Sequence, residues 1–255
     1  MVASLTLTAL DGVPTIEVGH DLVATIAAAL ERSDIRLCDD DVLILAQKII
    51  SKTEGRTVRL STVTPSTRAQ HLAAQSQKDA RLVELILQES TEVLRCRPGV
   101  LIVVHRLGFI LANAGIDVSN VDSDDGHETV LLLPANPDAS AANLKARIGE
   151  RLKADVGLII NDSMGRAWRL GTVGTAIGVA GLPSLLDLRG APDSTGRPLR
   201  VTEVGIADEL AAAASVLMGQ AAEGRPIVHV RGFPYPRRDG TAAELIRPKH
   251  MDLFR

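Results

Sequence analysis

The chain has 255 residues, a formal net charge of −3 and only 2% aromatic residues. This length supports a substantial core in one large or two small domains. The lack of a basic excess and of aromatic stacking platforms excludes a general nucleic-acid binder. No apolar run is long enough to span a membrane, and no secretory signal is evident. Because Cys38 and Cys96 lack metal-type spacing, we expect free thiols in a cytoplasmic protein.

The first ninety residues predict an alternation of strands and helices. Hydrophobic periodicity predicts strands over 3–9 and 42–45. Periodicity and helix-start residues predict a helix over 21–32, a second helix that begins at Pro65-Ser66-Thr67, and a third over 79–89. In residues 47–56 a short apolar pair is flanked by polar residues, and no regular element is predicted there.

The rest of the chain predicts more strands. Two apolar runs, 100–104 and 109–113, flank Arg106-Leu107-Gly108 and predict a hairpin. Further strands are predicted at 130–133, 156–160 and 227–230, and helices at 141–152 and 207–217. The mixture lacks regular βαβ alternation, so it predicts an α+β fold with mixed sheets, flanking helices and two subdomains. No repeat or biased linker marks a domain boundary, so residues 1–255 are taken as a single unit.

Familiar catalytic and nucleotide-binding motifs are absent from the sequence. It contains no G-x-x-x-x-G-K-[ST], G-x-G-x-x-G, H-E-x-x-H, C-x-x-C or G-x-S-x-G pattern, and its six histidines are scattered singly. A P-loop, a Rossmann site, a zinc protease and a serine hydrolase are therefore not supported.

Two segments carry the candidate chemistry: residues 112–120 and residues 161–169. Asp117 and Asp162 each lie, by prediction, just past an apolar strand, among small polar neighbours. Carboxylates in this setting are suited to a hard divalent cation and the phosphates it bridges, and Ser163 adds a hydroxyl oxygen. The residues predict a possible metal–phosphate site.

Polar and basic residues around these segments extend the candidate site. Asn120 can donate and accept hydrogen bonds, and Lys48, Lys52 and Arg166 can neutralise phosphate charge. Each residue also has a structural explanation, since an aspartate after a strand commonly forms a turn or a helix cap.

Taken in chain order, several segments resemble the coenzyme F420-0:γ-glutamyl ligase family. The matching segments are Gly12-Val13-Pro14, Ser51-Lys52-Thr53-Glu54-Gly55-Arg56, Gly108-Phe109, Ala112-Asn113-Ala114-Gly115-Ile116-Asp117-Val118-Ser119-Asn120, Asp162-Ser163-Met164-Gly165-Arg166-Ala167-Trp168-Arg169 and Met218-Gly219-Gln220-Ala221. The chain departs from the family at Ser163, where many members have Thr, and at Gln47 and Lys48, where others often have small hydroxyl residues.

The resemblance implies a GTP-dependent ligase that adds L-glutamate to coenzyme F420-0, a deazaflavin with a phosphodiester-linked side chain. An acyl phosphate would form first, and further γ-linked glutamates would follow. The resemblance also implies Mn²⁺ or Mg²⁺, K⁺, a homodimer and the family's α+β fold, and we expect no fused carboxyl-terminal reductase domain.

The resemblance also implies roles for individual residues. Catalytic roles fall on Asp117, Asp162, Lys52 and Arg166, and metal ligation on Asp117, Asp162, Ser163 and Gln220. Nucleotide contacts fall on Gly12, Val13, Pro14, Thr15, Gln47, Lys48, Lys52, Asn120, Met218, Gly219, Gln220, Ala221, Ala222, Glu223, Gly224 and Arg225. Two alternatives stay open: another metal-dependent nucleotide enzyme on the same scaffold, and a non-catalytic deazaflavin- or nucleotide-binding protein.

Overall fold

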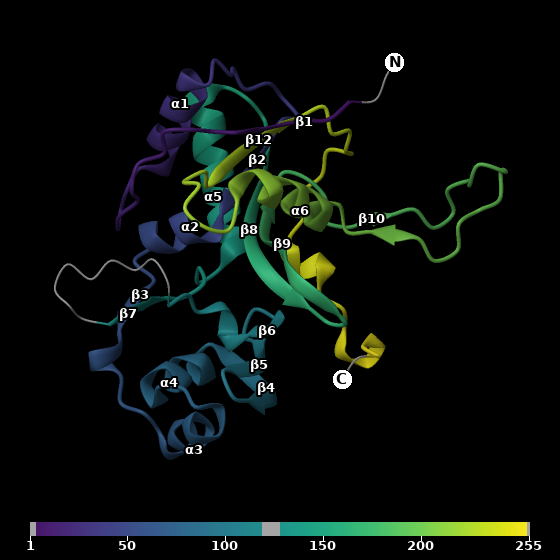
Figure 1. Cartoon of the computed structure of the whole chain (residues 1–255). Helices are drawn as coiled ribbons and strands as arrows, with labels where there is room; N and C mark the ends of the chain where they lie inside the picture. Colours follow the sequence, from purple (N-terminus) through teal and green to yellow (C-terminus); the bar gives the residue numbers. More distant parts are fainter. Residues whose placement is uncertain (1–3, 119–127, 254–255) are drawn as a thin grey trace.

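The computed structural model describes residues 4–118 and 128–253 and is built on a five-stranded sheet (Figure 1). In spatial order its strands are β1 (Thr6–Ala9), β12 (Ile227–Arg231), β2 (Val42–Ala46), β8 (Gly157–Arg166) and β9 (Arg169–Ala180). β2 and β8 are parallel, and every other neighbouring pair in this sheet is antiparallel. The parallel pair lies inside the sheet, with a neighbouring strand on each side.

Helices cover both faces of this sheet (Figure 1). α1 (Leu22–Arg32) and α5 (Pro137–Leu152) pack in one core with Leu43 and Leu45 of β2. α6 (Ile206–Met218) packs in a second core on the opposite face, with Val42 and Ile44. Since successive strand residues point to opposite faces, a strand buried on both sides must be apolar throughout. This explains why the Val42-Leu43-Ile44-Leu45 run has no alternation.

A second body lies below the main sheet in Figure 1 and has its own core. It consists of a three-stranded antiparallel sheet and two helices: β4 (Ser90–Arg97), β5 (Val100–His105), β6 (Ile110–Ala112), α3 (Thr67–Ser76) and α4 (Ala80–Gln88). β3 (Thr57–Arg59) pairs with β7 (Thr129–Leu131) in a small sheet between the two bodies. The predicted α+β class, with mixed sheets and flanking helices, is confirmed.

The remaining described elements are short. β10 (Leu186–Asp187) and β11 (Glu203–Val204) form the base of an arm that projects from the main body (Figure 1). Single 3₁₀ turns occur at η1 (Leu60–Thr62), η2 (Asn113–Gly115), η3 (Ala242–Leu245) and η4 (Lys249–Met251). Among the helices of residues 4–118 and 128–253, none has the length and apolar character needed to cross a bilayer.

The structure corrects the sequence-based elements in several places. Residues 47–53 form a helix, α2 (Gln47–Thr53), which begins directly after β2. The strands β3, β4, β9, β10 and β11 were not predicted. Asp162 does not lie past the end of its strand, because β8 continues to Arg166, paired with β9. The continuation depends on β9, whose glycines allow close packing and whose strand could not be recognised from periodicity alone.

One of these glycines supports a direct test of the packing between sheet and helix. A Cβ on Gly178 of β9 would lie 2.5 Å from the carbonyl oxygen of Pro137, the first residue of α5. We therefore expect Gly178→Ala to lower the free energy of unfolding by about 1–3 kcal/mol. In urea denaturation the matched variant Gly149→Ala, within α5, should instead stabilise by about 0.5–1 kcal/mol, because its Cβ meets only an ordinary contact at 3.7 Å. Equal stabilities of the two variants would contradict this packing.

Candidate active site

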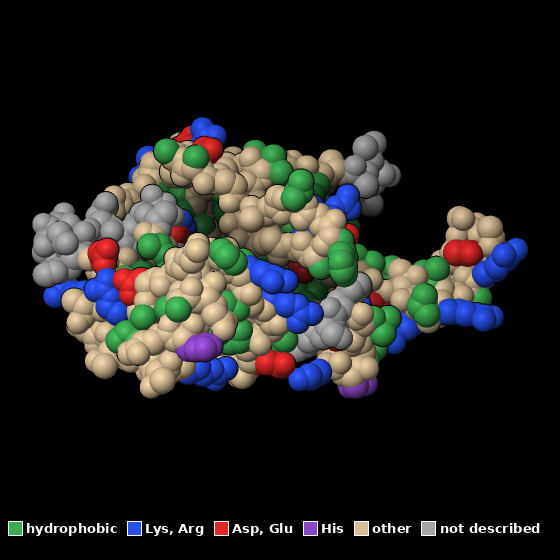
Figure 2. Space-filling view, turned by 60° about the horizontal axis from the view of Figure 1, so that its bottom comes forward, with side chains coloured by type: hydrophobic (Ala, Val, Ile, Leu, Met, Phe, Trp, Pro, Cys, Tyr) green, Lys and Arg blue, Asp and Glu red, His purple; other side chains and the backbone are tan. Residues whose placement is uncertain are grey.

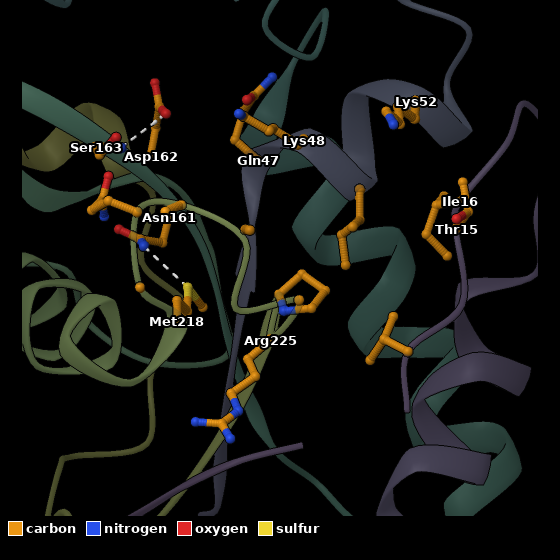
Figure 3. A pocket seen from close by; sticks show the side chains of 18 of the residues that line it. Thr15, Ile16, Gln47, Lys48, Lys52, Asn161, Asp162, Ser163, Met218 and Arg225 are labelled. Carbon is orange, nitrogen blue, oxygen red and sulfur yellow. Dashed lines mark hydrogen bonds between the residues drawn. The ribbon is translucent and has the colours of Figure 1, made fainter. Parts of the chain in front are cut away.

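A cavity of about 440 Å³ lies at the carboxyl ends of the parallel strands β2 and β8. The two strands end their pairing at Ala46 and Asn161, after which β2 leads into α2 and β8 continues as Asp162 and Ser163. Ligands in sheets with parallel strands commonly bind at such carboxyl ends. Figure 3 shows Asp162 and Ser163 on one side of the cavity, opposite Gln47 and Lys48 at the start of α2.

Asp117 reaches this site by a tightly turned segment. After β6, Asn113, Ala114 and Gly115 have φ angles of 52°, 54° and 66°, so the backbone takes the left-handed conformation three times in succession. Asp117 then forms an isolated antiparallel bridge with Leu131, each N–H donating to the other residue's carbonyl at 2.9 Å. The bridge holds the Asp117 backbone in place, and the turn explains the small residues that precede it.

Asp117, Lys48 and Asp162 interact electrostatically. The Lys48 Nζ lies 2.5 Å from Asp117 Oδ2. Burial raises the pKa of Asp162 to about 6, and the negative charge of Asp117 adds to this rise. Two groups oppose the rise: the Ser163 N–H, which donates to Asp162 Oδ1 at 2.9 Å, and the positive charge of Lys48. Burial and a like charge both favour the neutral carboxyl. A bound cation would favour the ionised form of Asp162.

The donors present fit a hard divalent cation that keeps part of its shell for water or phosphate oxygen. Asp162, Ser163 and Gln220 line the cavity and can supply a carboxylate, a hydroxyl and an amide oxygen, and Asp117 adds a second carboxylate next to the lining residue Lys48. Within residues 4–118 and 128–253, no group of three or more His, Cys, Asp or Glu side chains could hold a metal ion. Such a site leaves positions open for ligands that the protein does not supply.

Most of the residues expected to contact nucleotide do line this cavity. They are Val13, Pro14, Thr15, Gln47, Lys48, Lys52, Met218, Gly219, Gln220, Ala221, Gly224 and Arg225, together with Asp162 and Ser163. They come from the segment after β1, from α2, from β8, and from the last residue of α6 with the segment that follows it. The tertiary structure thus gathers residues that lie more than 200 positions apart. Their contacts with a nucleotide remain a prediction.

Five of the expected residues, Gly12, Asp117, Arg166, Ala222 and Glu223, do not line this cavity, although Asp117 interacts with the lining residues Lys48 and Asp162. Gly12 does not line the cavity; its carbonyl accepts a hydrogen bond from Arg32 Nη2 at 2.7 Å. Ala222 and Glu223 also lie outside the lining, and Glu223 Oε2 accepts from the Ala221 N–H at 2.8 Å, which closes the loop on itself. Arg166 lines a second cavity, because β8 carries it four residues beyond Asp162. Asn120 lies outside the described residues.

Gln47 and Lys48, two of the three positions that depart from the family pattern, have local explanations. Gln47 is buried, and its Nε2 donates to Ser51 Oγ at 2.5 Å and to the Leu132 carbonyl at 3.3 Å. It therefore ties the first turn of α2 to the chain that follows β7. Lys48 instead pairs with Asp117. Both side chains shape the cavity whether or not they contact a nucleotide.

Asn161 is a lining residue that the sequence analysis did not assign to the site. Its side chain is only 5% exposed, and its Nδ2 donates to Ser215 Oγ at 2.9 Å and to Met218 Sδ at 3.4 Å. Its Oδ1 has no hydrogen-bond partner among the residues that the structure describes, and a buried unpaired acceptor is costly unless a ligand satisfies it. An asparagine at the end of an otherwise apolar strand was the available signal.

Comparison with known proteins identifies the family. Residues 12–232 match the family model described as F420-0:Gamma-glutamyl ligase. The chain is 43% identical over 253 residues to the coenzyme F420:L-glutamate ligase of Methanothermobacter thermautotrophicus, covering 98% of this chain and 99% of that protein. It is 42% identical over 245 residues to the protein of the same name from Archaeoglobus fulgidus, covering 96% and 94% of the two chains. By this extent of similarity, and as its motifs predicted, the chain belongs to the F420-0:gamma-glutamyl ligase family.

Proposed function

We propose that this protein is a coenzyme F420:L-glutamate ligase that uses GTP to drive amide-bond formation. Support comes from family membership and from relatives so named that align over nearly the whole chain. The structural observation that carries the proposal is a cavity lined by Asp162 and Lys48, both of which interact with the neighbouring Asp117.

In this proposal the triphosphate lies along the basic side of the cavity. Lys48 and Lys52 from α2 and Arg225 from the loop before β12 line the space opposite Asp162 (Figure 3). Their charges would offset those of the phosphates, since Arg and Lys both bind phosphate oxygens. Asp117, Asp162, Ser163 and Gln220 would hold Mn²⁺ or Mg²⁺. The bound cation would supply charge neutralisation at the transferring phosphoryl group.

The reaction needs an activated acceptor, because a carboxylate does not condense with an amine unaided. A carboxylate oxygen of F420-0 would attack the γ-phosphorus of GTP, so that an acyl phosphate forms and GDP leaves. The amine of L-glutamate would then attack the acyl carbon, lose a proton and displace inorganic phosphate. Lys48 and Lys52 would keep the phosphates and the developing negative charge in place. No covalent protein nucleophile is required, in keeping with the absence of a G-x-S-x-G motif.

Three further features belong to the same proposal. Successive catalytic turnovers would add γ-linked glutamates, because each product again ends in a free carboxylate. The enzyme would work as a homodimer and would require K⁺, for which no residue is assigned.

Mass spectrometry tests the proposed function. Incubation with F420-0, L-glutamate, GTP, Mn²⁺ and K⁺ should give products heavier by one and then more glutamyl residues, with GDP and phosphate released in step. If the acceptor carboxylate carries ¹⁸O, one ¹⁸O should appear in the released phosphate. Glutamyl addition without GTP would overturn the GTP requirement, and phosphate free of ¹⁸O would overturn the acyl phosphate.

A charge change at Lys48 should separate cation binding from nucleotide binding. Lys48→Gln removes the ammonium group that pairs with Asp117. We expect affinity for Mn²⁺ alone to rise a few-fold, on the order of 0.5–1 kcal/mol for a partly exposed pair, and KM for GTP to rise roughly tenfold. Calorimetry with Mn²⁺ and steady-state kinetics measure the two effects. The matched variant Lys153→Gln, at the exposed end of α5, should change neither; a Lys48→Gln enzyme with wild-type values for both would contradict this role.

A further inference from the structure

A second cavity, of about 740 Å³, lies beside the first and is not used by the nucleotide in the proposal above. Its walls come from the β4–β5–β6 sheet, the β8–β9 hairpin and the carboxyl-terminal segment 245–252. Figure 2 shows hydrophobic and basic side chains bordering a hollow on this face of the molecule. Its volume is within the range of small-molecule sites.

The lining combines apolar and basic side chains. Phe109, Ile110, Met164 and Ile246 contribute apolar surface, whereas Arg95, Arg166, Arg247 and Lys249 contribute four positive charges. The two acidic lining residues are Glu92 and Asp252, and Glu92 pairs with Lys249 at 3.1 Å. The cavity thus carries a net positive charge around an apolar surface.

Arg166 is the basic group placed closest along the strand to the candidate active site. Its side chain is exposed, and no ion pair forms on it among the residues that the structure describes. A guanidinium without a carboxylate partner at the rim of an apolar cavity is suited to a phosphate or carboxylate of a ligand.

β8 connects the two cavities directly. Asp162 and Ser163 line the first, and Met164, Gly165 and Arg166, the next three residues, line the second. Asp162 is also the register partner of Thr175 on β9, which lines the second cavity. Four residues of strand span roughly 13 Å, so one elongated molecule could reach from Arg166 to Asp162.

We propose that this second cavity binds the deazaflavin end of the acceptor. The planar ring would lie on the apolar surface around Phe109, the phosphodiester would face Arg166, and the reacting carboxylate would extend along β8 toward Asp162. The inference rests on the proposed function, since it assumes that F420-0 is the acceptor. An aromatic body with an anionic side chain matches the apolar and basic lining in both shape and charge. Arg166 is then an acceptor-binding residue.

Fluorescence of the deazaflavin provides a binding test that needs no turnover. F420-0 is titrated with the full-length protein in the absence of GTP and glutamate, and binding is followed by anisotropy. We expect Arg166→Gln to raise the Kd for F420-0 by about tenfold or more and Phe109→Ala to raise it to a similar extent. Arg166→Lys should recover part of the loss. The Kd for a fluorescent GTP analogue should stay within about twofold of wild type in all three variants.

Matched controls separate this cavity from the nucleotide site and from folding. Arg68→Gln removes an exposed arginine of α3 that lines neither cavity, and it should leave both Kd values unchanged. Lys52→Gln should raise the Kd for the GTP analogue and leave that for F420-0 unchanged. Thermal unfolding shows whether each variant folds.

The outcomes distinguish failure of this inference from failure of the proposed function. If the wild-type protein neither binds F420-0 nor extends it with glutamate, the proposed function fails. If the wild-type protein extends F420-0 but Arg166→Gln and Phe109→Ala keep wild-type Kd values, only the cavity assignment is overturned. If these variants change the sedimenting mass instead of the Kd, the cavity is a contact with a second copy of the chain, and the assignment is overturned as well.

Discussion

Asp162→Asn is expected to abolish glutamate-dependent GDP release while leaving the protein folded. Asp162 is one of the two carboxylates that would hold the divalent cation, and an amide cannot replace its charge. We expect kcat/KM for GTP to fall about a thousandfold or more, which corresponds to about 4 kcal/mol of transition-state stabilisation. Chromatographic measurement of GDP in the presence of F420-0, glutamate and Mn²⁺ gives this value.

Two variants serve as controls for this loss. Glu150→Gln removes an exposed carboxylate of α5 that lines neither cavity, and should keep wild-type activity. Ser163→Ala removes a neutral oxygen and should reduce activity less than Asp162→Asn. GDP release by Asp162→Asn at the wild-type rate would contradict the assignment of this carboxylate.

The same variant should stabilise the protein in the absence of metal. Burial, with the nearby charge of Asp117, raises the pKa of Asp162 from 3.8 to about 6. A raised carboxyl pKa means that the folded state holds the proton more tightly than the unfolded state, so ionisation above about pH 6 opposes folding. Asp162→Asn should therefore raise the free energy of unfolding by about 1–3 kcal/mol at pH 8. The gain should shrink as the pH falls from about 6 to 4 and vanish below.

Glu89 provides a control of opposite sign for this measurement. Burial of Glu89 opposes its ionisation, but hydrogen bonds from His105 and Arg106 and the charges of Arg56 and Arg106 outweigh it and lower its pKa to about 2. A lowered carboxyl pKa contributes stability above the unfolded value, and this contribution is lost as the pH falls toward 2. In urea denaturation at pH 8 with chelator present, Glu89→Gln should destabilise and Asp162→Asn should stabilise. Destabilisation by both would contradict the electrostatic argument for Asp162.

Much of the main sheet could be predicted from the sequence because its chemistry is local. The runs at 42–45 and 156–160 are apolar throughout, as strands buried on two faces require, and both are strands. The hairpin around residues 106–108 could also be predicted from local sequence, because two apolar runs flank a turn that contains Gly108, whose φ is 92°. The helices over 21–32 and 79–89 are confirmed as α1 and α4, where Asp21 and Asp79 accept hydrogen bonds as N-caps.

Other elements depended on contacts that a linear pattern does not contain. α2 has only seven residues and no side-chain cap at its start, so its stability comes from packing and from the Gln47 hydrogen bonds rather than from propensity. The continuation of β8 past Asp162 depends on pairing with β9, where glycines allow α5 and α6 to approach closely. The separation of Arg166 from Asp162 follows from this continuation, since an extended strand carries residues four apart to different cavities.

The sequence by itself determined the family and the α+β class, because these depend on residue types in a fixed order, and it predicted the two aspartates as site residues. Only the tertiary structure decided that Asp117 and Asp162, 45 positions apart, interact electrostatically. The physical reason is that separate backbone pairings hold them: Asp117 is bridged to Leu131, and Asp162 lies in the ladder between β8 and β9. Burial at their meeting point then produces the raised pKa of Asp162, a property that neither segment has alone.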